Sequence, residues 1–65
     1  MVYFDYESAA REAGLDDEQL AAVKEAIRLE FPTDDMMWEL HVLRICLAIR
    51  DGHATMQDVT GPLPA

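Results

Sequence analysis

The chain has 65 residues, of which 13 are acidic and 5 are basic, so its formal net charge at pH 7 is −8. Hydrophobic residues make up 51% of it, which excludes a disordered chain. A surface with this much negative charge repels phosphate backbones. The charge therefore favours a basic partner, or serves only to keep the protein soluble.

The sequence also bears on where the protein resides. No apolar run approaches the ~18 residues that a membrane-spanning helix requires, so no membrane segment is expected. Residues 1–5 lack the basic start and the long apolar stretch of a signal peptide. We therefore expect a cytoplasmic location.

The small size of the chain limits how it can be stabilised. At 7.3 kDa it is too short for a second core, and one small core gives only marginal stability. The single cysteine, Cys46, cannot form an intramolecular disulfide. The two histidines and one cysteine are too widely spaced for the usual structural zinc site, so we expect no metal and no other cofactor. Self-association is then the favoured way to complete the core.

Caps and breakers mark the first two helices. Asp5 is a good N-cap for a helix that Gly14 ends, because glycine enters the left-handed conformation without strain. Asp16 and Gln19 have the spacing of a capping box, so a second helix is expected to begin there. Its apolar residues recur at helical spacing as far as Pro32, which stops the helix.

A third helix is expected after this proline. Thr33 is its predicted N-cap, residues 36–50 form its body, and Gly52 ends it. Thr55 then caps a last short turn over residues 56–59.

These elements predict an all-α fold of three helices and a short C-terminal helical turn. We expect them to form a single helical domain over residues 1–60, followed by an extended tail over residues 61–65.

The third helix carries two apolar stripes, whereas an ordinary surface helix carries one. At about 100° per residue, the first stripe consists of Met36, Leu40, Leu43 and Leu47. The second stripe, on roughly the opposite side, consists of Trp38, Val42, Ile45 and Ile49. We assign the first stripe to the second helix of the same chain and the second to a partner. Because a second copy is the simplest partner, this assignment predicts a homodimer packed through the third helix.

The predicted interface combines the second stripe with a polar seam at its edge. Its residues are Trp38, Val42, Ile45, Ile49, His41 and Arg44. Trp38 is the expected anchor, because tryptophan joins a large apolar area to one hydrogen-bond donor that can stay wet. The alternative is a monomeric bundle, in which the short helices and the tail cover both stripes and Trp38 lies inside one chain.

A second candidate surface is acidic. Six carboxylates could form a negative face that binds a basic partner by imitating a phosphate backbone: Asp16, Asp17, Glu18, Glu25, Asp34 and Asp35. The alternative is that acidic residues near helix N-termini stabilise the helices and keep the chain soluble, without any partner.

Two functional hypotheses follow from these features. The first is a small acidic interaction module that regulates or inhibits a partner protein. No catalytic set and no glycine-rich phosphate loop occurs in the sequence, so we predict that it is not an enzyme. The second is a helix-turn-helix dimer that binds nucleic acid, because residues 9–23 have Ala10, Gly14 and Leu20 at the small, turn and aliphatic positions of that unit. Its recognition helix would open with three acids, which phosphates repel, so nucleic acid is not the expected partner.

Overall fold

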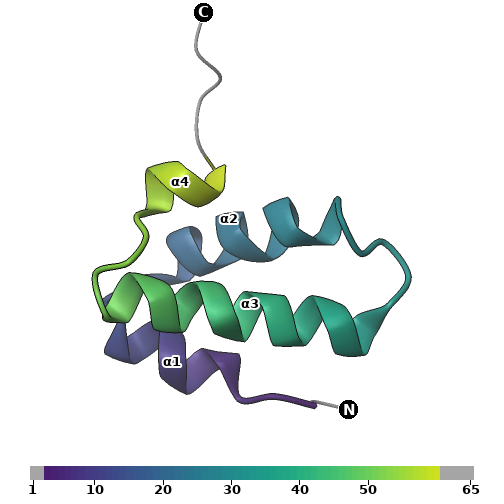
Figure 1. Cartoon of the computed structure of the whole chain (residues 1–65), viewed down its shortest axis with the longest axis horizontal. Helices are drawn as coiled ribbons and strands as arrows, with labels where there is room; N and C mark the ends of the chain where they lie inside the picture. The colour runs from purple at the N-terminus through teal and green to yellow at the C-terminus, as the bar shows by residue number, and fades with distance from the viewer. Residues whose placement is uncertain (1–2, 61–65) are drawn as a thin grey trace, which may run out of the picture.

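The chain folds into helices alone in the part that the structure, a computed structural model, describes, namely residues 3–60. The helices are α1 (Tyr6–Glu12), α2 (Asp17–Arg28), α3 (Asp35–Arg50) and α4 (Met56–Thr60), as Figure 1 shows. This arrangement confirms the predicted all-α fold. Among these elements we find no helix with both the length and the apolar character needed to cross a membrane. The tail predicted over residues 61–65 lies outside the described residues.

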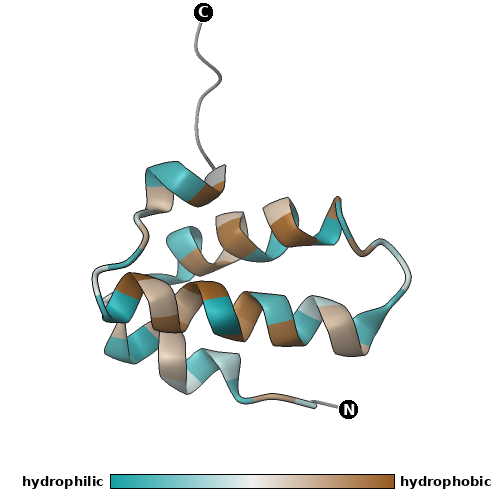
Figure 2. Ribbon diagram, viewed as in Figure 1, coloured by the Kyte–Doolittle hydropathy of each residue, from teal (hydrophilic) through white to brown (hydrophobic). Residues whose placement is uncertain are grey.

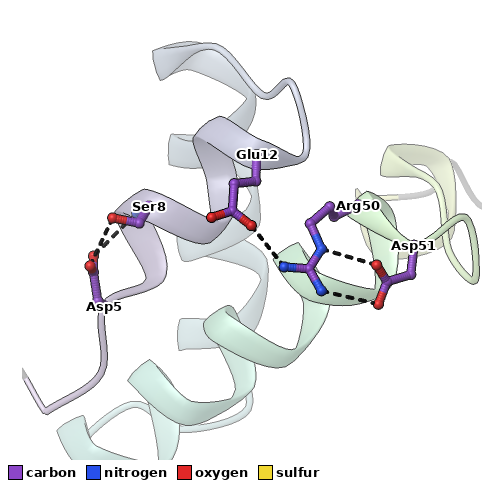
Figure 3. Close-up of polar contacts among 5 residues, drawn as sticks. All are labelled: Asp5, Ser8, Glu12, Arg50 and Asp51. Carbon is purple, nitrogen blue, oxygen red and sulfur yellow. Dashed lines mark hydrogen bonds and ion pairs between the residues drawn. The ribbon is translucent and has the colours of Figure 1, made fainter.

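Helix starts are fixed by the side chains that the sequence marks as caps. One carboxylate oxygen of Asp5 accepts the backbone N–H of Ser8 at 3.2 Å, and the other accepts the Ser8 hydroxyl at 2.8 Å (Figure 3). These bonds lower the pKa of Asp5. Asp16 accepts the N–H of Gln19 at 2.7 Å, and the Gln19 side chain accepts the N–H of Asp16 at 3.0 Å. The reciprocal pair confirms the predicted capping box.

Two glycines end helices, and a further reciprocal pair begins α4. Gly14 and Gly52 have φ angles of +78° and +80°, a conformation that residues with a side chain rarely adopt. Both therefore act as the predicted stops for α1 and α3. The Thr55 hydroxyl accepts the N–H of Asp58 at 3.2 Å, while the Asp58 carboxylate accepts the N–H of Thr55 at 2.9 Å. This pair confirms the predicted cap of the last turn.

Two predicted boundaries were wrong, both in the segment between α2 and α3. The N-cap of α3 is Asp34, whose carboxylate accepts the N–H of Met37 at 3.1 Å, and not Thr33. Aspartate is the stronger N-cap of the two residue types. Helix α2 ends at Arg28 rather than running up to the proline. Instead, the Arg28 guanidinium donates to the carbonyl of Phe31 at 3.2 Å, which satisfies a backbone acceptor beyond the helix end.

Helix α3 lies in the middle of the molecule, with α1 and α2 packed against it and α4 packed against α2 (Figure 1). Each of the three longer helices contributes two hydrophobic residues to the buried core, which consists of Ala9, Ala10, Val23, Ile27, Val42 and Cys46. The alanines of α1 have short side chains, so this helix can approach α3 closely. The core is thus built around one side of α3.

One arginine ties the end of α3 to the end of α1. The guanidinium of Arg50 lies 2.7 Å from the Glu12 carboxylate and 3.0 Å from that of Asp51 (Figure 3). The hydrogen bond from Arg50 lowers the pKa of Asp51. Because these groups are exposed to solvent, water screens both ion pairs, and they add little to the free energy of folding. The contact orients the two helices more than it stabilises them.

A buried glutamate holds the segment before α1. Glu39 of α3 is only 4% exposed. Its Oε1 atom accepts the backbone N–H groups of Tyr3 and Phe4, at 2.7 and 3.1 Å. The sequence alone gives Glu39 no such role. In the structure it is a buried acceptor that joins the start of the chain to the central helix.

Replacing Glu39 tests this anchor. Glu39→Ala removes the acceptor from two part-buried N–H groups and should lower the free energy of unfolding by about 1–3 kcal/mol. Glu39→Gln keeps a side-chain oxygen of the same reach and should lose clearly less. Urea unfolding followed by circular dichroism measures both variants. Equal losses for the two variants would show that the hydrogen bonds do not hold this segment.

Candidate interaction surfaces

The inward face of α3 is defined by its buried residues. Glu39, Val42 and Cys46 are all buried and fall at the spacing of one helix face. Burial raises the pKa of the Cys46 thiol, which is therefore protonated at neutral pH. This face is the one that α1 and α2 cover. It is fully occupied within the chain.

Trp38 is held by contacts within its own chain. Its indole N–H donates to the carbonyl of Lys24 in α2 at 2.9 Å. Its ring meets the ring of Tyr6 in α1 edge to face, with centroids 5.9 Å apart. The guanidinium carbon of Arg28 lies 3.9 Å from the ring centroid, a cation–π contact that joins α2 to α3. Trp38 thus lies where α1, α2 and α3 meet.

These contacts correct the assignment of the second stripe to a partner. Trp38 and Val42 were predicted to face a partner, but Trp38 contacts α1 and α2, and Val42 is 0% exposed. Ile45 also packs against the core, and Ile49 is half-buried. The reason is that α2 and α1 offer a carbonyl, a guanidinium and a tyrosine ring to the indole. Leu43 and Leu47 of the first stripe also pack against the core, so both stripes contribute to it. Association between copies stays a prediction, and this stripe is not its surface.

The two polar residues of the predicted interface lie apart from this core. The ring of His41 lies 4.5 Å from that of Phe31, and its Nδ1 donates to the carbonyl of Met37 at 2.8 Å. Arg44 is exposed, and no ion pair joins it to any other residue in the range 3–60. Of the six predicted interface residues, Arg44 therefore has the most open surroundings.

The opposite side of α3 forms a second surface, which we call the α3 outer face. It consists of Met36, Met37, Leu40, Arg44 and Ala48. Met36 is 50% exposed and the other apolar members are half-buried. Within the described chain, neither Met37 nor Leu40 is among the side chains packed against the core. Hydrophobic residues recur along the whole length of α3 (Figure 2).

The six carboxylates of the predicted acidic face do not form one face. Helix α2 lies along the long direction of the molecule (Figure 1), and its 12 residues separate its two ends by about 18 Å. Asp16, Asp17 and Glu18 therefore lie at the opposite end from Asp34 and Asp35. Asp16 and Asp34 accept backbone N–H groups as caps. Asp35 pairs with Arg28 at 2.9 Å.

What remains is an acidic surface on α2. Asp17, Glu18 and Glu25 are exposed, and no salt bridge neutralises them within residues 3–60. Glu18 and Glu25 lie two helical turns apart, about 10 Å, on the side facing away from the buried Val23 and Ile27. We call these three residues the α2 acidic surface. These three of the six predicted carboxylates are neither helix caps nor members of a salt bridge among residues 3–60, so they are available for contact with a partner.

The described residues contain no enclosed pocket and no group of three or more side chains placed to hold a metal ion. The chain matches no protein-family model, and comparison with curated proteins and with solved structures gives no match either. The α3 outer face and the α2 acidic surface are the candidate interaction sites of the described residues.

Substitution of Trp38 tests where this residue lies. Because Trp38 joins three helices of one chain, Trp38→Ala should lower the free energy of unfolding by about 3–5 kcal/mol. A loss of that size would leave so small a domain largely unfolded. Trp38→Phe keeps an aromatic ring beside Tyr6 and Arg28 and should lose distinctly less. Circular dichroism and urea unfolding at low protein concentration measure both. A folded Trp38→Ala variant with unchanged stability would contradict the intrachain position.

Proposed function

We propose that this chain is a non-enzymatic protein–protein interaction module that associates with itself and regulates or inhibits a partner protein. The observation that supports the proposal is the separation of two surfaces. The α3 outer face is apolar except for Arg44 and bears no carboxylate, whereas the α2 acidic surface consists of three exposed carboxylates. A chain with one apolar and one acidic surface on different helices is suited to two contacts at once.

The partner of the α2 acidic surface is a basic protein. Glu18 and Glu25 have no basic neighbour in an ion pair, so their charge is available to a cationic groove. Grooves that bind nucleic acids are of this kind, and an acidic helix occupying one would compete with the nucleic acid. The chain would then act as an inhibitor by occupation, without any chemistry of its own.

The helix-turn-helix alternative is less well supported. Helices α1 and α2 are joined through a left-handed turn at Gly14, as that unit requires. However, α2 would be the recognition helix, and its exposed side bears Glu18 and Glu25. Two carboxylates on that side would face phosphates and base edges, which weakens binding to DNA.

Affinity capture with matched charge variants tests the proposed function. The variant Glu18→Gln/Glu25→Gln removes two charges from the α2 acidic surface. The control Glu7→Gln/Glu30→Gln removes two exposed charges elsewhere, so both variants have the same net charge. We expect wild type and control to retain a basic protein from the source cell, the first variant to lose most of it, and added DNA to displace it.

Two results would contradict the proposal. Equal retention by both double variants would show that the α2 acidic surface is not the contact. Direct binding of labelled DNA by the purified chain, with an affinity that falls steeply with salt, would favour the helix-turn-helix alternative instead.

A further inference from the structure

We propose that Asp51–Gly52, at the end of α3, is a site of spontaneous conversion of aspartate to isoaspartate, and that the folded chain suppresses this reaction. The chain contains no asparagine, and this is its only Asp–Gly pair. In such a pair the backbone nitrogen that follows the aspartate is unhindered, because glycine has no side chain. The reaction is internal to the chain, so it does not depend on the proposed function.

The conversion proceeds through a cyclic imide. The backbone nitrogen of Gly52 attacks the side-chain carboxyl carbon of Asp51, a nitrogen–carbon bond forms, and the carboxyl OH leaves with the amide proton as water. Water then opens the ring at either carbonyl. Addition at the former side-chain carbonyl restores aspartate, whereas addition at the former backbone carbonyl gives isoaspartate, in which the main chain runs through Cβ. No electrons are transferred, and the mass of the chain is unchanged.

The backbone conformation of Asp51 holds the two reacting atoms apart. Ring closure requires the Gly52 nitrogen and the Cβ of Asp51 to lie on the same side of the Cα–C bond of Asp51. The ψ angle of Asp51 is 0°, which instead eclipses that nitrogen with the backbone nitrogen of Asp51. The N–H of Gly52 also donates to the carbonyl of Ile49 at 3.2 Å, so the proton that must leave is engaged in a hydrogen bond. Cyclisation therefore requires the end of α3 to open first.

Arg50 holds the carboxylate of Asp51. Its Nε donates to one carboxylate oxygen at 3.0 Å and its Nη2 to the other at 3.4 Å, so the carboxylate faces the guanidinium (Figure 3). The same hydrogen bonding lowers the pKa of Asp51. The ionised carboxylate is the less reactive form, because the step expels water from a protonated carboxyl group. Arg50 thus opposes the reaction both by position and by charge.

Isoaspartate at position 51 changes how the chain leaves α3. The backbone N–H groups of His53 and Ala54 both donate to the carbonyl of Ala48, at 2.8 and 3.3 Å. An additional main-chain carbon between residues 51 and 52 displaces both donors. Helix α4 follows directly and packs against α2. Conversion therefore weakens the docking of α4, and the damage remains when the end of α3 closes again.

Incubation of the full-length chain at neutral pH tests the proposal. Isoaspartate is measured over time by enzymatic methylation of isoaspartyl groups, and peptide mapping assigns it to residue 51. Folded wild type should accumulate isoaspartate at least about tenfold more slowly than the urea-unfolded chain, because local opening must precede the reaction. Asp51→Glu keeps a carboxylate but cannot close a five-membered ring, so it should give no signal at this position.

A matched pair of variants tests the role of Arg50. Arg50→Gln releases the Asp51 carboxylate and should raise the rate in the folded chain about two- to fivefold, in keeping with the small free energy of an exposed ion pair. Arg50→Gln also removes the ion pair with Glu12. The control Glu12→Gln removes that pair alone and leaves Arg50 against Asp51, so it should keep the wild-type rate. Urea unfolding of both variants measures any difference in their stability.

Several outcomes would overturn the inference. Absence of isoaspartate from residue 51 even in the unfolded chain excludes the site. Equal rates in folded and unfolded wild type show that the fold does not suppress the reaction. Equal acceleration by Arg50→Gln and Glu12→Gln excludes protection through the contact between Arg50 and Asp51. An isolated isoaspartyl chain that unfolds in urea like wild type excludes the effect on α4.

Discussion

Burial of one face of α3 is the constraint on which the rest of the structure depends. Val42 and Cys46 are 0% exposed at its centre, and α1 and α2 are placed by what they contribute to that burial. The alanines of α1 allow close approach, while α2 supplies Val23 and Ile27. Trp38 then joins all three helices at one end. On the other side of α3, Met36 is 50% exposed, and Met37 and Leu40 are half-buried.

Local features of the fold were predictable, because the interacting residues are neighbours in the sequence. The Asp16–Gln19 capping box and the left-handed turns at Gly14 and Gly52 need only three or four residues to form. The cap of α3 shows the limit of such reasoning. Thr33 and Asp34 are both acceptable N-caps, and the structure uses Asp34, whose carboxylate accepts the N–H of Met37.

Tertiary features were not predictable in the same way. The helical periodicity of the sequence identified two apolar stripes on α3. It contains no information on which stripe faces α2. In the structure, the contacts of the Trp38 indole place the second stripe against α1 and α2. Glu39 gives no sign in the sequence of accepting two backbone N–H groups from the start of the chain. The acidic set divides for a similar reason. The ends of helices far apart in space, such as those bearing Glu18 and Asp34, look equivalent along the sequence.

We infer that one face of α3 forms a complete core within a single chain, so that folding does not require association. Reaction of the Cys46 thiol with a thiol-specific reagent tests it, at dilutions where light scattering finds only monomer. For a core worth about 3 kcal/mol, labelling should be roughly a hundredfold slower than in the urea-unfolded chain, because the buried thiol reacts only when the fold opens. Labelling of the dilute monomer at the rate of the unfolded chain would show that a single chain does not form a complete core.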